Sequence, residues 1–248
     1  NVGTAESAIN QANIDSLNSM RLSTSGSIIA TLFGNIAMIK NLSNGKIGNY
    51  TYNVLDAANS SDMQDIDAKT NITTYQMTGG FSDSSENIFD TNAVKAAVAT
   101  IVSRDLDVGI TITGTLNTTQ VNAVLAITDY TGNLIATLSG TNTELNSLNS
   151  TTDDTVNITV TDGVSIANIT TLEGKTSGSL TFSSGIADTL ANLAPSGTVN
   201  NNITGAVTVT VSGTQSTATN VTHLDAVRGA TTGSVTATLS STLAVLKE

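Results

Sequence analysis

The sequence SGSIIATLFG at residues 25–34 returns almost unchanged at two later places in the chain. It reads TGNLIATLSG at 131–140 and TGSVTATLSS at 232–241. Weaker variants lie between these copies, and their starts are mostly about 22 to 28 residues apart. A repeat of this length is typical of units that bury their apolar faces only by stacking on their neighbours. The sequence therefore predicts a repetitive array.

Nine segments have the pattern of a strand with one buried and one open face. Apolar residues alternate in them with Thr, Ser or Asn, as in Val207-Thr208-Val209-Thr210. Strict alternation and β-branched side chains both favour strands. The predicted strands are 27–33, 48–54, 71–77, 107–113, 133–139, 155–161, 179–184, 206–212 and 234–240.

Between several strands the apolar spacing changes to three and four residues, which predicts short amphipathic helices. The helix-forming sets are Val94, Val98 and Ile101; Val121, Val124 and Leu125; Leu145 and Leu148; Ile166, Ile169 and Leu172; and Leu190 and Leu193. One glycine set follows the helices, and we expect it to end them in a left-handed conformation: Gly26, Gly132, Gly178, Gly205 and Gly233. A second set is expected to close the strands: Gly34, Gly79, Gly114, Gly140, Gly163, Gly185 and Gly213.

These patterns predict an α/β repeat solenoid of about nine coils. Each coil is a short helix plus one strand, and the strands form a parallel sheet wall, because a helix between strands permits parallel pairing. The alternative is an all-β right-handed β-helix. We expect one continuous solenoid, an excerpt of a longer chain, with divergent repeats at 1–79, an irregular repeat with a polar insertion at 80–106, and regular repeats at 107–248.

The composition limits both the core and the partners of the chain. Aromatic residues make up 3% of it and Trp is absent, which predicts a thin core of small aliphatic residues. Nine Lys and Arg against twenty Asp and Glu give a net charge of -11, so we expect no nucleic-acid partner. No apolar run is long enough for direct membrane insertion. The chain has no Cys, which excludes disulfides and thiolate metal sites.

Three stretches then resemble a known type of sequence: 161–167 (TDGVSIA), 184–193 (SGIADTLANL) and 230–240 (ATTGSVTATLS). They are similar to the tandem β-strand repeats of giant extracellular and cell-surface proteins of cyanobacteria and other aquatic bacteria. The resemblance is good over 114–248 and weaker over 1–106. It implies an extracellular or cell-surface location and a role as a structural or adhesive component of a filament, fibre or surface layer.

No residues have the arrangement of a catalytic site. His223 is the only histidine, and its surroundings predict a surface helix residue. Without a strained nucleophile beside an oriented base, Ser-His-Asp chemistry has no support here. We therefore expect no enzyme, no catalytic residues and no bound cofactor.

The acidic clusters leave Ca²⁺ as the one metal ion that the chain could bind, because Ca²⁺ prefers six to eight oxygen ligands. The clusters are Asp62, Asp65 and Asp67; Asp105 and Asp107; and Asp153 and Asp154. None of them matches a known calcium loop, so we interpret them first as solvated helix caps and turn residues. The metal ligands, if any, stay undefined.

The open face of the sheet is the candidate interaction surface. Its predicted threonines are Thr111, Thr113, Thr159, Thr161, Thr208, Thr210, Thr236 and Thr238. Flat ranks of Thr can bind ice or sugars, although Thr is also the polar residue that best suits strands. The sequence thus predicts a non-enzymatic structural segment of an exported surface-layer, filament or matrix protein that acts by self-assembly, alone or with other surface-matrix components. The alternative is a binding or adhesion module for glycan, ice or calcium.

Overall fold

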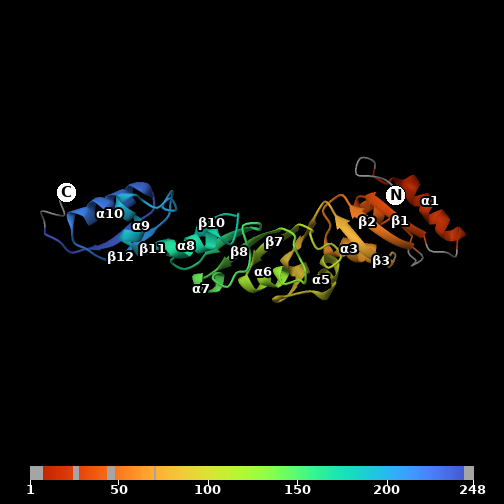
Figure 1. Ribbon diagram of the computed structural model, residues 1–248, viewed down its shortest axis with the longest axis horizontal. Coiled ribbons are helices and arrows are strands. Elements are labelled where there is room, and N and C mark those ends of the chain that lie inside the picture. Colours follow the sequence, from red (N-terminus) through yellow and green to blue (C-terminus); the bar gives the residue numbers. More distant parts are fainter. Residues whose placement is uncertain (1–7, 25–27, 44–47, 70, 243–248) are drawn as a thin grey trace. The chain divides into compact units, whose positions relative to one another are not determined.

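The computed structural model describes residues 8–24, 28–43, 48–69 and 71–242. The chain divides into two compact units, and the division passes through strand β8 (Leu134–Gly140). The first unit is Asn1–Thr137 with Asp153–Thr155, and the second is Leu138–Thr152 with Val156–Glu248. Helices and parallel strands alternate along both (Figure 1), so the protein is a mixed α/β structure of short parallel strands.

The first unit contains the sheet β1-β2-β3 and the parallel pair β4-β7. It also contains the first part of β8, which lies next to β7. Strands β1 and β2 pair in one register over seven residues, which places Leu32 beside Tyr52. Its elements before β8 are α1 (Gln11–Ser23), β1 (Ile28–Gly34), α2 (Ile36–Ile39), β2 (Gly48–Val54), α3 (Ser60–Asp67), β3 (Asn71–Met77), β4 (Phe81–Ser84), α4 (Ser85–Ile88), β5 (Phe89–Asp90), β6 (Ala93–Val94), α5 (Ala96–Val102), β7 (Ile110–Leu116) and α6 (Thr118–Leu125).

The second unit holds the strand order β8-β9-β10 and the sheet β11-β12-β13, both parallel where pairs are described. Its elements after β8 are α7 (Asn142–Leu145), β9 (Thr155–Val160), α8 (Ile166–Glu173), β10 (Leu180–Phe182), β11 (Ile186–Thr189), α9 (Leu190–Leu193), the 3-10 turn η1 (Pro195–Gly197), β12 (Val209–Gln215), α10 (Ala218–Ala230) and β13 (Val235–Leu239).

The nine predicted strands are confirmed as β1, β2, β3, β7, β8, β9, β10, β12 and β13, with starts that differ by three residues at most. Residue 27 of the first prediction lies outside the described residues. Four strands were not predicted: β4, β5, β6 and β11. They have two to four residues each.

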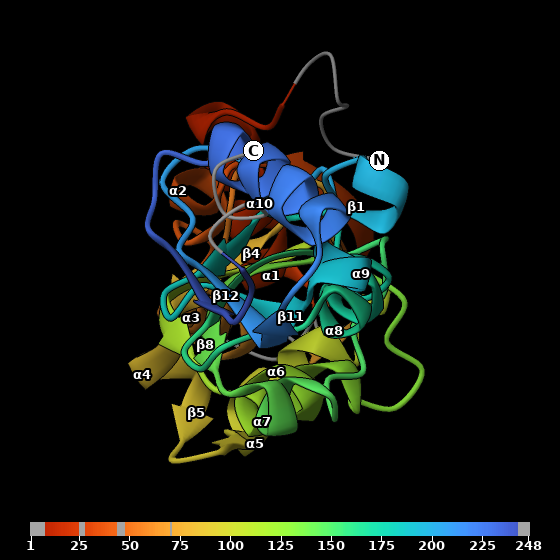
Figure 2. The same cartoon turned by 90° about the vertical axis from the view of Figure 1, so that its left-hand side faces the viewer.

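The predicted helices are confirmed as α5, α6, α7, α8 and α9, with two corrections at their ends. Leu148 is buried but follows α7, and Val94 belongs to β6. The stretch predicted as a polar insertion before α5 folds as β4, α4 and the antiparallel pair β5-β6. In Figure 2, β5 is the short yellow arrow near α5.

Most of the glycines before the strands do not have the predicted left-handed conformation that would end a helix. Of the described members of that set, Gly205 alone has a positive φ, of 60°. At Gly178 a Cβ atom would lie 2.4 Å from the carbonyl oxygen of Val156, and at Gly233 one would lie 2.3 Å from that of Val207. Gly132 meets the carbonyl oxygen of Val108 in the same way, at 2.0 Å. These three glycines let the backbone approach the preceding repeat closely, while Gly26 lies outside the described residues.

The strand-closing set also needs a correction. Gly114 and Gly213 have φ values of 97° and 79°, and β7 and β12 continue for two residues beyond them. Because left-handed backbone suits Gly, each lies within its strand without ending it. Gly34 and Gly140 do end their strands, as predicted.

The core differs between the two units. In the first unit Tyr50, Tyr52 and Tyr75 are fully buried, and the rings of Tyr50 and Tyr52 meet edge to face with centroids 6.1 Å apart. The prediction of a thin aliphatic core is therefore wrong for this unit. The second unit does bury an aliphatic core, which includes Leu145, Ile158, Ile169, Leu193 and Val209.

Candidate functional site

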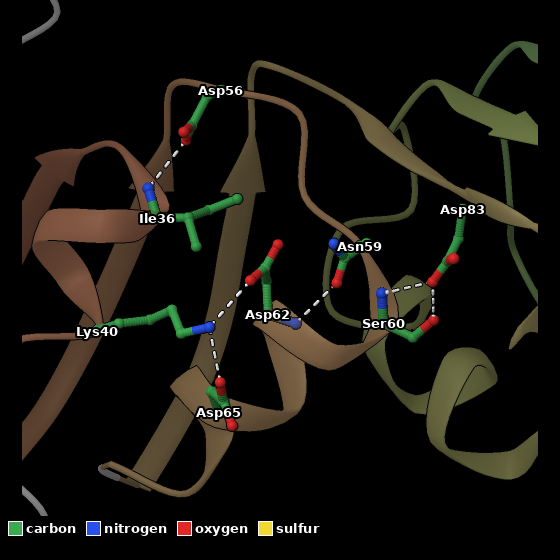
Figure 3. A network of polar contacts seen from close by, with 8 residues as sticks. All are labelled: Ile36, Lys40, Asp56, Asn59, Ser60, Asp62, Asp65 and Asp83. Carbon is green, nitrogen blue, oxygen red and sulfur yellow. Dashed lines mark hydrogen bonds and ion pairs between the residues drawn. The ribbon is translucent and has the colours of Figure 1, made fainter.

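A recurring hydrogen bond joins an aspartate to the first residue of the helix one repeat earlier. In each case the carboxylate accepts the backbone N–H, which has no partner inside its own helix. The pairs are Ile36 with Asp56 (2.9 Å), Ser60 with Asp83 (2.9 Å), Asn142 with Asp162 (2.8 Å) and Ile166 with Asp188 (3.0 Å). We call this contact the carboxylate latch; Figure 3 shows the first two.

Two of the latches have the same local sequence, Asp-Ser/Thr-x-x-Asn. The second oxygen of Asp83 accepts the N–H of Ser84 and the side-chain amide of Asn87, at 2.8 and 2.7 Å. Asp188 accepts the N–H of Thr189 and the amide of Asn192 at 2.7 and 2.8 Å. One carboxylate thus fixes the turn of its own repeat and the helix of the preceding one.

Asp83 is held in its ionised form. Burial opposes ionisation, but hydrogen bonds from Ser60, Asn87 and Ser84 outweigh it, so the pKa of Asp83 lies below its usual value. The Ser60 hydroxyl also donates to Asp83. A carboxylate that accepts several hydrogen bonds is a strong structural acceptor and a poor proton donor. The surroundings of Asp83 therefore favour a structural role.

The first predicted acidic cluster lies beside this network (Figure 3). Lys40 forms ion pairs with Asp62 at 3.0 Å and with Asp65 at 2.7 Å. The hydrogen bond from Lys40 lowers the pKa of Asp65, and the two carboxylates raise that of Lys40. A shallow hollow of about 450 Å³ lies next to Lys40, Asp56 and Asp62. Because a lysine already occupies the space between these carboxylates, they are poorly arranged for Ca²⁺.

Asp67, the third acid of that cluster, pairs with Arg104 and not with Lys40. Asp67 accepts a hydrogen bond from Arg104. The Arg104 guanidinium also donates to the Tyr75 hydroxyl at 2.9 Å, and it lies over the Tyr75 ring, 5.4 Å from the ring centroid. Burial raises the pKa of Asp67, and Arg104 acts against that rise. The arginine thereby joins α3, β3 and the segment after α5.

The interpretation of the other two acidic clusters as solvated residues is wrong for one member of each. Asp105 is 9% exposed and accepts the N–H of Met77. Asp154 is 5% exposed and accepts the N–H of Leu134 at 3.0 Å. Their neighbours Asp107 and Asp153 are exposed, as predicted. In the part of the chain that the structure describes, no three His, Cys, Asp or Glu residues gather as a metal-binding group.

The predicted threonine face is mostly solvent-exposed. Thr111 and Thr159 are half-buried, and the exposed members are Thr113, Thr161, Thr208, Thr210, Thr236 and Thr238. The register sets Thr210 directly beside Thr236. A register shift after Val211 then brings Thr238 opposite Thr214.

The other threonines of this face have mixed neighbours. Thr111 and Thr113 pair with Ser82 and Ser84 of β4, and Thr159 pairs with Thr181 of β10. Thr161 and Thr208 lie just outside β9 and β12. Two apolar side chains on outward strand positions are also exposed, Ile29 at 82% and Ile135 at 43%. Hydroxyl and apolar side chains are therefore mixed on this face.

His223 lies within α10 and is half-buried, as the sequence predicted for a helix residue near the surface. Its Nε2 atom lies 3.1 Å from the position that a Cβ atom on Gly197 would take.

A second recurring contact was also not predicted. The Thr176 hydroxyl donates to the carbonyl oxygen of Val156 at 2.7 Å and accepts the N–H groups of Val156 and Gly178. Thr231 repeats the donor contact to Val207 and the acceptor contact from Gly233. The signal in the sequence is Thr two residues before a glycine, just ahead of a strand. This contact and the latch are the structural features that recur most clearly.

Comparison with models of known families, with curated proteins and with solved structures finds no match to this chain. Within the described ranges, no helix has the length and apolar content that crossing a bilayer requires.

Proposed function

We propose that the chain is a non-enzymatic structural repeat segment of an exported surface-layer, filament or matrix protein, and that it acts by self-assembly. The carboxylate latch is the observation that supports this most directly. Four aspartates bind the preceding helix in the same way, so the best-organised polar groups of the molecule are used to hold successive repeats together. A protein that works through its length needs such contacts more than it needs a pocket.

The same proposal includes the finer architecture, a continuous solenoid of about nine helix-plus-strand coils. The spacing of the latches supports it, since partners lie 20 to 23 residues apart in both units. The extracellular location rests on the sequence resemblance and on the absence of cysteine. The solenoid architecture and the extracellular location are independent parts of the proposal, so either one can be wrong without the other.

Self-assembly is supported by the outer strands of the described sheets. β1 pairs with β2 alone and β13 with β12 alone among the described strands. The inward residues Val235 and Ala237 of β13 are half-buried, whereas Leu134 and Leu138 of β8 are fully buried. A strand with an open edge and a partly covered apolar face is suited to pairing with another strand of the same kind.

Electron microscopy and sedimentation velocity of the full chain over a range of concentrations test this proposal. We expect filaments or lattices at high concentration and their loss in Ala237→Lys, because an inward charge on an edge strand opposes pairing. Thr119→Lys on exposed α6 is the matched control and should assemble normally. A chain that stays monomeric at every concentration would contradict the proposal.

A second candidate is a binding or adhesion module for glycan, ice or calcium. The side-by-side exposed pair Thr210 and Thr236 favours it. Ice-growth inhibition, binding to a glycan array and a calcium-dependent shift in melting temperature are its three readouts. We expect Thr210→Val with Thr236→Val to remove the first two and to leave assembly intact, whereas Thr219→Val on α10 should change neither.

A further inference from the structure

The first unit contains a hollow of about 600 Å³ at strands β2, β3, β7 and β8. This volume lies within the range of about 300–1,000 Å³ that is usual for small-ligand sites. Asn53 and Gln76, which pair in register, line the hollow from β2 and β3, and Thr111 and Ile135 line it from β7 and β8. Each of these four residues lies between two buried residues of its strand. The hollow is therefore on the open face of the strands.

Gly109 lines the hollow although the fold does not require a glycine there. Its carbonyl oxygen accepts the N–H of Phe81 at 2.9 Å, and at the equivalent position of the next strand Asn133 accepts the N–H of Ile110 at 2.9 Å. The φ of Gly109 is not left-handed, and a Cβ atom on it would have no atom within 4 Å beyond its chain neighbours. Because neither packing nor backbone conformation explains this glycine, the missing side chain leaves space for a ligand to approach the strand.

Hydrogen bonds fix the orientation of the amides that line the hollow from β2 and β3. The Thr78 hydroxyl donates to Oδ1 of Asn53 at 2.6 Å, and Nδ2 of Asn53 donates to Oε1 of Gln76 at 3.0 Å. Because the Gln76 oxygen already accepts this bond, its exposed side chain presents Nε2 as a donor. The hollow thus contains a hydrogen-bond donor that is oriented before any ligand binds.

Two carboxyl groups also line the hollow, the buried Asp105 and the exposed Asp107. An ionised carboxylate only accepts hydrogen bonds, so these groups complement the amide donor of Gln76. Among the described residues that line the hollow there is no Lys, Arg or His. An anionic ligand would therefore be repelled.

We propose that this hollow binds an uncharged oligosaccharide. A sugar hydroxyl both donates and accepts hydrogen bonds, so neighbouring hydroxyls match an amide donor and a carboxylate acceptor. Ile135, which is 43% exposed, gives the C–H face of a sugar ring an apolar contact. The ligand class is that of the second candidate function above, but the site lies away from the Thr210 and Thr236 pair. The inference does not depend on self-assembly.

Isothermal titration calorimetry of the full chain with neutral oligosaccharides of glucose, mannose and galactose tests the site. We expect binding of at least one of them and none in Gly109→Asn, which gives this position the side chain that Asn133 has in the next strand. Because a Cβ atom meets no neighbour at Gly109, this variant should keep the melting temperature of the parent. Gly229→Asn is the matched control, since it is exposed on α10 and a Cβ atom there also meets nothing within 4 Å.

Two further variants test the polar groups. Gln76→Ala should weaken binding about threefold to tenfold, the effect of one hydrogen bond. Gln64→Ala, at an exposed position of α3, should bind like the parent. An oligosaccharide of uronic acids should bind more weakly than the neutral probes. Asp107→Asn should reduce that difference, because it removes a negative charge and keeps an oxygen acceptor.

A chain that binds none of the neutral oligosaccharides at millimolar concentration would overturn the proposal. A folded Gly109→Asn that binds like the parent would also overturn it, and loss of binding in Thr210→Val with Thr236→Val would then assign the glycan to the threonine pair. If Gly109→Asn does not fold, Gln76→Ala decides in its place. Titration at concentrations where sedimentation velocity shows a monomer keeps this result separate from self-assembly.

Discussion

Ile166 and Asp188 lie 22 residues apart in the chain, and the N–H of the first donates to the carboxylate of the second at 3.0 Å. Ile166 is the first residue of α8, where the N–H groups need partners from outside the helix. Asp188 belongs to the next repeat and also accepts two bonds from its own turn, from Thr189 and Asn192. Successive repeats are thus joined by charge-assisted hydrogen bonds as well as by apolar packing.

Removing this latch should destabilise the second unit. We expect Asp188→Ala to lower the free energy of unfolding by about 2 kcal/mol, since a hydrogen-bonded charge contributes more than a neutral group. Urea denaturation at pH 7 measures it. Asp225→Ala, exposed within α10, is the control and should stay within about 0.5 kcal/mol of the parent. Equal effects at the two positions would show that the latch adds no stability.

Gly178 should not tolerate a side chain, although its φ is not positive. A Cβ atom would lie 2.4 Å from the carbonyl oxygen of Val156, so Gly178→Ala should cost about 2–4 kcal/mol or shift β10 away from β9. Gly174→Ala is the matched control, because its nearest neighbour is 3.5 Å away and its φ is −74°. That variant should be neutral or slightly stabilising. The melting temperatures of both variants distinguish a steric clash of the new Cβ atom at position 178 from the general effect of replacing a glycine by alanine.

The Thr176 hydroxyl should matter more than its methyl group. Thr176→Val keeps the shape but leaves the N–H and carbonyl groups of Val156 without this partner, which should cost about 2–3 kcal/mol. Thr176→Ser restores the hydroxyl and should recover most of the loss. Thr181→Val, at an exposed position of β10, should be nearly neutral. The measurement is urea denaturation followed by circular dichroism.

Asp83 should make the first unit sensitive to acid. Its pKa is lowered in the folded chain, so its stabilisation is complete above the unfolded value of about 3.9. That stabilisation is lost as the pH falls through the folded value. We expect Asp83→Asn to be less stable than the parent at pH 6 and nearly equal to it at pH 2. A constant difference over this range would assign the effect to packing alone.

The local elements could be predicted because their signals are local. The alternation over 155–160 and the spacing of Ile166, Ile169 and Leu172 each lie within one element, and β9 and α8 are found there. The predicted core composition failed in the first unit because composition averages over the chain, whereas Tyr50, Tyr52 and Tyr75 gather in one place.

The latches and the glycine contacts could not be predicted in the same way. Asp188 lies in β11, a strand that was not predicted, and its partner Ile166 follows only from the number of residues in the intervening repeat. The same is true of Gly178 and Val156. The motif Asp-Ser/Thr-x-x-Asn at Asp83 and Asp188 is the signal that a search for shared polar patterns could have found.

The sequence by itself determined where nine of the described strands and the helices α5 to α9 lie, because side-chain periodicity and turn residues act over a few neighbouring positions. Only the tertiary structure decided how one repeat binds the next. It showed that aspartates hold the preceding helices, that glycines make room for a neighbouring backbone, and that Asp105 is buried beside Met77. These contacts join residues twenty or more positions apart, and their geometry exists only once the strands have paired in register.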